Sequence, residues 1–127
     1  MGYAEVKQNS EICGSEVFNR EHLERYTLGD EALERELLEL FAVQAQQQLG
    51  FLADCNDTET WRVANHTLKG AAVAVGAFAV AQLAENLENL AYNSNVAEQD
   101  RLLAELSHEV ARCQTELLRR FGAAAPK

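Results

Sequence analysis

The sequence is poor in proline, in basic residues and in long apolar runs. Its one proline is Pro126, and its seven glycines are scattered along 127 residues. Eleven Lys and Arg stand against 20 Asp and Glu, so the formal net charge is -9. Proteins that bind duplex nucleic acid neutralise its phosphates with clustered Lys and Arg, so nucleic acid is not expected as a partner. The same charge argues against docking on an anionic membrane.

Cysteine is also scarce, and its pattern is uninformative for chemistry. Cys13, Cys55 and Cys113 are odd in number and far apart, and no pair has the spacing of a metal site. We therefore expect three reduced thiols in a cytoplasmic protein, with Cys55 and Cys113 in structural roles. The longest apolar run, residues 71–81, is too short to span a bilayer and indicates buried core. No signal peptide is evident, so no membrane association is predicted.

Leu, Ala, Glu and Gln are abundant, which favours helix over strand. Apolar residues recur at steps of three and four, and this periodicity predicts amphipathic helices. The expected helices span residues 15–25, which form a short one, and 31–54, 59–75, 78–92 and 96–121, which are long. Turn and cap residues separate them at Gly29-Asp30, Asn56-Asp57-Thr58, Gly76 and Asn93-Ser94-Asn95.

Four long helices with short connections must pack antiparallel to their sequence neighbours. The sequence thus predicts an all-α, antiparallel up-down-up-down four-helix bundle with a short additional N-terminal helix. Residues 1–11 are expected to form a flexible tail, 12–121 the bundle domain and 122–127 a frayed end. We expect a monomer, since no second apolar stripe is evident. The expected core comprises Val17, Phe18 and Leu23; Leu33, Leu37, Leu40, Phe41, Leu49 and Leu52; Leu83, Leu87 and Leu90 or Ala91; and Val96, Leu103, Leu106, Val110, Cys113, Leu117 and Phe121.

The helix over residues 59–75 carries a histidine that does not belong to the core. With His66 at zero on a wheel of about 100° per residue, the apolar residues fall between about 140° and 240°. The imidazole therefore points to solvent from the middle of the outer face. A lone surface histidine is usually ordinary, so its neighbours decide its meaning. The apolar residues opposite it are Trp61, Ala64, Leu68, Ala71, Ala72 and Val75.

Two cations share the exposed flank with His66. Lys69 and Arg62 lie one turn to either side of it, where helical residues become neighbours. They would stabilise an anion placed on the imidazole. In a chain of net charge -9 this basic pair is a local exception.

Gly70 also adjoins His66 on the wheel. A glycine inside a helix costs about 1 kcal/mol relative to alanine, which suggests that something approaches the backbone there. Val63 and Val73 lie on the same exposed face. Together with His66 and Gly70, they suggest a small docking patch.

The run His66-Thr67-Leu68-Lys69-Gly70-Ala71-Ala72, followed by Gly76-Ala77 and Leu87-Glu88, resembles the signature of histidine-containing phosphotransfer (HPt) domains. These are relay modules of multistep two-component signalling, and the helix plan extends the resemblance over most of the chain. The resemblance implies that His66 is phosphorylated and that Lys69 neutralises the phosphoryl oxygens. It also implies that Gly70 clears space for the partner and that Gly76 ends the active helix.

Such domains commonly place a polar residue beside the histidine from the next helix. If the hairpin turns near Gly76, the residues level with His66 are Glu85, Glu88 and Asn89. An acid would repel a phosphoryl group, so we expect Glu88 to accept a hydrogen bond from the imidazole. Glu85 and Glu88 complete the expected partner-binding set with Gly70, Arg62, Val63 and Val73.

The resemblance also implies partners and a reaction. His66 would take a phosphoryl group from an aspartate of a response-regulator receiver domain, or from a hybrid histidine kinase, and pass it to another receiver. The chain would be a phosphocarrier without kinase activity, because it has no nucleotide-binding loop. No intrinsic cofactor is expected, and Mg²⁺ would come from the receiver. His22, His66 and His108 are too dispersed to form a metal site.

Two alternatives use the same exposed helix. One is a helical interaction adaptor on which no phosphate moves, and it needs the same docking patch. The other is the dimerisation and phosphoacceptor hairpin of a histidine kinase. That hairpin usually shows an acid after the histidine and a proline nearby, whereas Thr67 follows His66 here and no proline is close.

Overall fold

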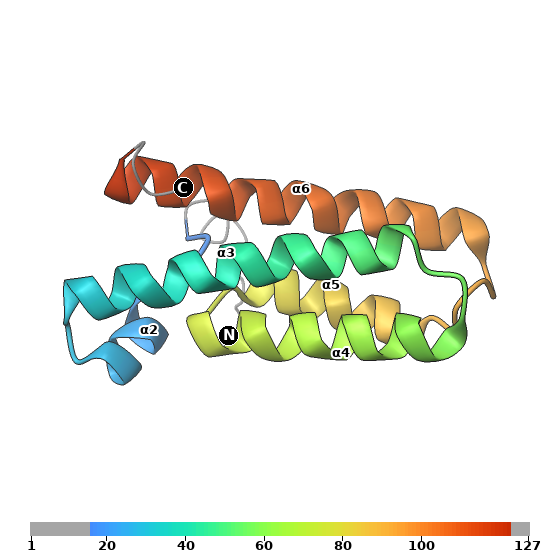
Figure 1. Cartoon of the computed structure of the whole chain (residues 1–127), viewed down its shortest axis with the longest axis horizontal. Coiled ribbons are helices and arrows are strands. Elements are labelled where there is room, and N and C mark those ends of the chain that lie inside the picture. Colours follow the sequence, from blue (N-terminus) through green and yellow to red (C-terminus); the bar gives the residue numbers. More distant parts are fainter. Residues whose placement is uncertain (1–15, 123–127) are drawn as a thin grey trace, which may run out of the picture.

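A computed structural model describes residues 16–122, which form helices joined by short turns. The four long helices run antiparallel to their sequence neighbours (Figure 1), and α3 and α5 each pack on α4 and α6. The all-α bundle with a short additional N-terminal helix is confirmed. The predicted tail 1–11, Cys13 and residues 123–127 lie outside the described residues. The helices are α2 (Arg20–Thr27), α3 (Glu31–Ala53), α4 (Thr58–Val75), α5 (Phe78–Asn89) and α6 (Val96–Phe121).

Short polar side chains determine where four of the helices begin. Asn19, Asp30, Asp57 and Asn95 each accept a hydrogen bond from a backbone N–H of the first turn. These caps satisfy donors that a helix start leaves without partners. The predicted cap at Asp30 is therefore confirmed, and the predicted turn and cap segment Asn56-Asp57-Thr58 contains the cap of α4, Asp57. The short helix was predicted to begin at residue 15, but it begins at Arg20 because Asn19 is its cap.

Gly76 ends α4 as predicted, with a φ of 77°. Its carbonyl accepts a hydrogen bond from the backbone N–H of Asn19 at 2.9 Å. A Cβ at Gly76 would lie 3.0 Å from the nitrogen of Asn19 and 3.1 Å from its Cβ and its carbonyl oxygen. Glycine is thus required twice, once by the left-handed backbone and once by the close approach of the chain before α2.

Substituting Gly76 by alanine is expected to lower the free energy of unfolding by about 2–3 kcal/mol. Roughly half of this loss comes from the left-handed backbone and the rest from the contact with Asn19. Gly29 is the matched control, since its φ is 81° and nothing lies within 4 Å of its missing Cβ. Urea unfolding of Gly76→Ala and Gly29→Ala measures the difference. Equal losses would show that the contact with Asn19 contributes nothing.

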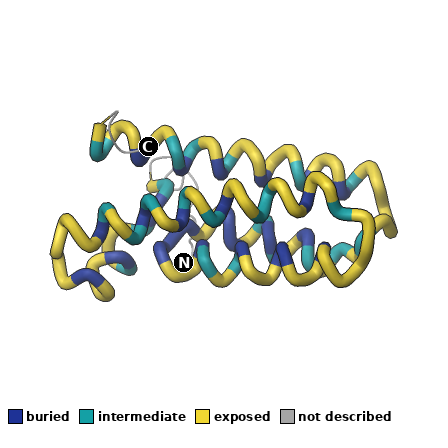
Figure 2. Tube along the Cα trace, in the orientation of Figure 1, coloured by how far each residue is buried: buried dark blue, intermediate teal, exposed yellow. Residues whose placement is uncertain are grey.

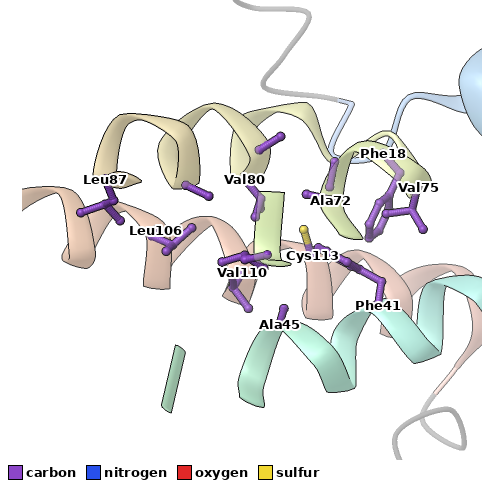
Figure 3. Packing of buried hydrophobic residues seen from close by; sticks show 14 of the residues in the cluster. Phe18, Phe41, Ala45, Ala72, Val75, Val80, Leu87, Leu106, Val110 and Cys113 are labelled. Atoms are coloured by element: carbon purple, nitrogen blue, oxygen red, sulfur yellow. The ribbon is translucent and has the colours of Figure 1, made fainter. Parts of the chain in front are cut away.

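The core lies along the bundle axis, and the outer faces of the helices are exposed (Figure 2). Figure 3 shows apolar side chains from all four long helices meeting there, with Phe18 from the segment before α2. The face of α4 opposite His66 is buried as predicted, although Ala71 is only half-buried. Side chains labelled in Figure 3 are Phe18, Phe41, Ala45, Ala72, Val75, Val80, Leu87, Leu106, Val110 and Cys113.

The core stripe of α3 differs from the predicted one. Leu33 and Leu40 were expected inside, but they are 38% and 57% exposed. The fully buried stripe instead begins at Leu38, and Leu37 and Leu49 are only half-buried. Leucines at 37, 38 and 40 fit two stripes, and the positions of α4 and α6 determine which one is covered. The buried apolar residues of α3 are Leu38, Phe41, Ala45 and Leu52.

A second apolar stripe remains exposed on α3, contrary to the sequence analysis. Besides Leu33 and Leu40 it contains Val43 and Phe51, each 55% exposed. We call these four residues the α3 outer stripe. The reason given for expecting a monomer therefore fails.

The ends of α5 and α6 also differ from the prediction. The helix α5 ends at Asn89 rather than at Tyr92. Tyr92 instead donates a hydrogen bond from its hydroxyl to the carbonyl of Cys55 at 2.9 Å. Leu90, not Ala91, packs against the core. In α6, Val96 is 53% exposed because it opens the helix, and Leu102 replaces the half-buried Leu103 as the core residue.

Candidate functional site

His66 stands on the outer face of α4, in the orientation that the helical wheel predicted. Its side chain is 66% exposed. On the opposite side of α4, Ala64 and Leu68 are buried in the core. The short helix α2 does not screen the imidazole, so a macromolecule can reach it from solvent.

Trp61 sets the register between α4 and α5. Its indole Nε1–H donates to the carbonyls of Leu87 at 3.0 Å and Leu90 at 3.2 Å. The Leu87 carbonyl also accepts the backbone N–H of Leu90 at 3.2 Å, so the indole is its second donor and joins α4 to the C-terminal end of α5. Glu88 lies beside His66 in the same stretch of α5. Helical periodicity predicted Trp61 only as a core residue and gave no sign of these hydrogen bonds.

Glu88 approaches the histidine ring from α5. Its Oε2 lies 3.4 Å from Nδ1 of His66, and its side chain is 21% exposed. This distance slightly exceeds the usual N–H···O range of about 2.7–3.2 Å. Over residues 16–122, no side chain or backbone group bonds the other ring nitrogen, Nε2. The two nitrogens therefore differ: Nδ1 faces a carboxylate and Nε2 remains available.

The two predicted cations, Lys69 and Arg62, differ in whether they form an ion pair. Lys69 is half-buried, and in the described part of the chain its ammonium has no ion-pair partner. Arg62 is exposed and donates to Glu59 at 2.8 Å. This hydrogen bond and the charge of Glu59 raise the pKa of the Arg62 guanidinium above its ordinary value, and the charge of Glu88 adds a smaller effect. Lys69 is thus the cation available to an anion on His66.

Gly70 is exposed, one turn beyond His66. A Cβ built there would meet nothing within 4 Å outside its own helix backbone. The bundle itself therefore gives no reason for a glycine at this position. Val63 and Val73 are 45% and 41% exposed on the same face. The structure brings together the predicted docking patch of His66, Gly70, Val63 and Val73.

The remaining predicted residues lie on α5 or in the core. Glu85 is half-buried and Asn89 is exposed. Burial raises the pKa of the Cys113 thiol to about 12, so it does not ionise near neutral pH. The half-buried Cys55 donates to the carbonyl of Asp57 at 3.1 Å. Neither thiol is placed to act as a nucleophile.

Two hollows on the surface of the described residues lie away from His66. One hollow lies between the segment before α2 and the end of α6, another between α5 and α6, and no α4 residue lines either. Across residues 16–122, no three His, Cys, Asp or Glu side chains gather closely enough to hold a metal ion. Within the same range, no helix is long and apolar enough to cross a membrane. An imidazole that is exposed on the outer face of a helix suits chemistry on a protein partner rather than on a small substrate, which usually binds in a concave site.

Comparison with known proteins decides the family. A family model described as "Hpt domain" matches residues 32–116. The chain belongs to the Hpt family. Hpt domains are histidine phosphotransfer modules that relay phosphate with receiver domains, and they are typically phosphocarriers rather than enzymes. The matched region runs from α3 into α6 and includes His66 and Glu88.

A solved structure supports the Hpt fold. The crystal structure of histidine-containing phosphotransfer protein B (HptB) from Pseudomonas aeruginosa PAO1 matches with a TM-score of 0.73 and 18% sequence identity. The match covers 84% of this Hpt protein and 95% of the other chain. At this identity the likeness establishes the fold alone. No curated protein matches the sequence.

Proposed function

We propose that His66 accepts a phosphoryl group from an aspartyl phosphate of a receiver domain or from a hybrid histidine kinase, and relays it to the aspartate of another receiver. One observation carries the proposal. The imidazole is 66% exposed on the face of α4 opposite the core, with a carboxylate 3.4 Å from one ring nitrogen and the other nitrogen available. A structural histidine would need no such exposure.

The asymmetry of the ring selects the nucleophile. With its proton on Nδ1, toward Glu88, the neutral imidazole presents the lone pair of Nε2 to the partner. An Nε2–P bond forms as the phosphorus–oxygen bond of the aspartyl phosphate breaks, and the aspartate leaves as a carboxylate. The Nδ1–H proton stays on the ring, which becomes cationic. The Glu88 carboxylate stabilises this positive charge, and the reverse reaction has a good leaving group.

Lys69 supplies charge stabilisation from this chain. Phosphoryl transfer depends mainly on positioning and on neutralising the phosphoryl oxygens. Lys69 lies one turn from His66 and has no competing ion pair in the described region. Arg62 must first leave Glu59 in order to contribute, which an exposed ion pair in water permits.

The bound cation is expected from the partner. Within residues 16–122, His66 has one acidic contact, Glu88, which is too few oxygen ligands for Mg²⁺. When bound in the receiver, Mg²⁺ neutralises the transferring phosphoryl group. This chain then supplies the nucleophile, Lys69 and the docking surface.

The transfer is tested with a receiver domain that carries a radiolabelled aspartyl phosphate. After mixing with this protein and Mg²⁺, label should move to the chain and should be labile in acid but stable in alkali. A panel of receivers is needed, each shown to transfer to another Hpt protein. If no receiver transfers to this chain, the phosphocarrier proposal is wrong and the interaction adaptor becomes the better account.

Glu88→Ala is expected to slow transfer roughly tenfold, because the carboxylate 3.4 Å from Nδ1 that orients the ring is lost. The ring ¹⁵N shifts of His66 should show the proton moving from Nδ1 toward Nε2, while Glu88→Gln, which keeps an acceptor oxygen, should preserve the tautomer. Glu36→Ala, an exposed carboxylate on α3, is the control. A wild-type tautomer and rate in Glu88→Ala would remove Glu88 from the mechanism.

A further inference from the structure

Exposed apolar side chains continue from the docking patch toward the C-terminal end of α4. Val73 is 41% exposed, Phe78 at the start of α5 is 44% exposed, and Tyr26 in α2 is 62% exposed. The α2 helix lies beside the end of the bundle where α4 turns into α5 (Figure 1), and it contacts α4. The residues beyond Gly76 were not part of the predicted partner-binding set.

A histidine ring connects Phe78 with Tyr26. The imidazole of His22 lies 5.2 Å from the ring of Phe78 and 5.2 Å from the ring of Tyr26, edge-on to both. These centroid distances are typical of packed aromatic pairs. Phe78, His22 and Tyr26 therefore form one continuous surface, which we call the aromatic row.

Asn19 fixes the aromatic row relative to α4. Its side chain accepts the backbone N–H of His22 at 2.8 Å and so caps α2. Its own backbone N–H donates to the carbonyl of Gly76 at 2.9 Å. Asn19 thus links the start of α2 to Gly76, the residue that ends α4. The aromatic row is presented in a set position with respect to His66, so a partner does not have to order it on binding.

The size of a protein interface lets a partner on His66 reach the C-terminal end of α4, beyond which the aromatic row begins at Phe78. A standard interface covers about 800 Å² per partner, which corresponds to a disc of roughly 16 Å radius. At about 1.5 Å per residue, α4 ends roughly 14 Å beyond His66. In the other direction the exposed face of α4 carries the Arg62–Glu59 ion pair. Interface cores are enriched in aromatic residues and depleted in charge, which favours the direction of the aromatic row.

We propose that a receiver domain docked on His66 extends its contact past Val73 onto the aromatic row, so that α2 contributes to receiver binding. This inference rests on the proposed function, because the partner is the same receiver domain. The aromatic row lies too far from Nε2 to touch the phosphoryl group. It therefore sets affinity and leaves the chemical step unchanged.

Tyr26→Ala and Phe78→Ala are tested singly and together in single-turnover transfer from a phosphorylated receiver at increasing receiver concentration. The double variant should raise the half-saturating concentration at least tenfold, which corresponds to about 1.4 kcal/mol of binding. The maximal rate and loading by phosphoramidate, a small phosphodonor, should stay within about twofold. Tyr26 is exposed, so its variant keeps the assay interpretable if Phe78→Ala unfolds.

Phe51→Ala is the matched control, because Phe51 is a 55% exposed aromatic residue on the α3 outer stripe. Unchanged half-saturation in the Tyr26 and Phe78 variants would overturn the inference, as would a loss of affinity in Phe51→Ala alone. Sedimentation is measured in parallel. A change of oligomeric state in the Tyr26 variant without a change in receiver binding would assign the aromatic row to a second copy and also overturn it.

Binding of the unphosphorylated receiver is followed separately by NMR titration, so the docking proposal does not depend on transfer. A wild-type protein that binds the receiver but never accepts phosphate would refute the proposed function, while Tyr26→Ala would still test the footprint. A wild-type protein that neither binds nor transfers would overturn both.

Discussion

Replacing His66 by glutamine is expected to abolish phosphoryl transfer, a loss on the order of a thousandfold or more, because no other group at the site can form the N–P bond. The fold should be unaffected. The side chain is 66% exposed, and surface substitutions usually change stability by less than about 0.5 kcal/mol. The measurement is acid-labile label after incubation with a phosphorylated receiver, together with a urea unfolding curve.

His108 provides the control for this assignment. It is exposed on α6, away from the docking patch, and replacing it by glutamine should leave transfer unchanged. If label persists in His66→Gln, or disappears only when His108 is replaced, the phosphoacceptor has been assigned to the wrong residue.

Gly70→Gln is expected to slow transfer roughly a hundredfold, because a side chain at this position displaces the partner's aspartate from in-line geometry. The same change should stabilise α4, since glycine costs about 1 kcal/mol in a helix interior. Among the described residues, no atom outside the backbone of α4 itself lies within 4 Å of the missing Cβ, so the new side chain meets no obstacle there. Activity and stability should therefore change in opposite directions, which distinguishes steric obstruction from damage to the fold.

Gly50 offers the same substitution away from the site. It lies in α3, is exposed, and likewise has no atom within 4 Å of its missing Cβ. Gly50→Gln should transfer phosphate at the wild-type rate. Equal slowing in both variants, or a wild-type rate in Gly70→Gln, would contradict the steric account of Gly70.

Much of the fold followed from chemistry local in sequence. Asp30 caps its helix as predicted, the predicted segment 56–58 contains the cap of α4, and Gly76 ends α4, because each acts on backbone groups within a few residues. The orientation of His66 followed from helical periodicity alone. These features needed no knowledge of the neighbouring helices.

Features that depend on distant contacts were missed. Leu33 and Leu40 were assigned to the core because leucines at neighbouring positions fit two stripes, and only the packing of α4 and α6 selects one. Tyr92 leaves α5 for the carbonyl of Cys55, which lies 37 residues earlier. Trp61 reaches the carbonyl of Leu87, 26 residues later. Helical periodicity contains no information about such partners.

In the candidate site, too, features local in sequence were predicted and contacts between distant segments were not. The position of Glu88 beside His66 was predicted from the hairpin turn at Gly76, which fixes which residues lie level. Its 3.4 Å approach, like the hydrogen bond from the Trp61 indole to Leu87, is a contact between two helices, and helical periodicity does not predict such contacts. The hydrogen bond from Asn19 to Gly76 could not be predicted from the sequence either, because no periodic pattern relates these two segments.

The position of Glu88 has a consequence for how long a phosphorylated form persists. The carboxylate attracts the cationic ring that it faces and repels the negative oxygens of a phosphoryl group on the other nitrogen, while Lys69 attracts those oxygens. We therefore expect the charge at position 88 to set how long the loaded protein survives between its encounters with two receivers.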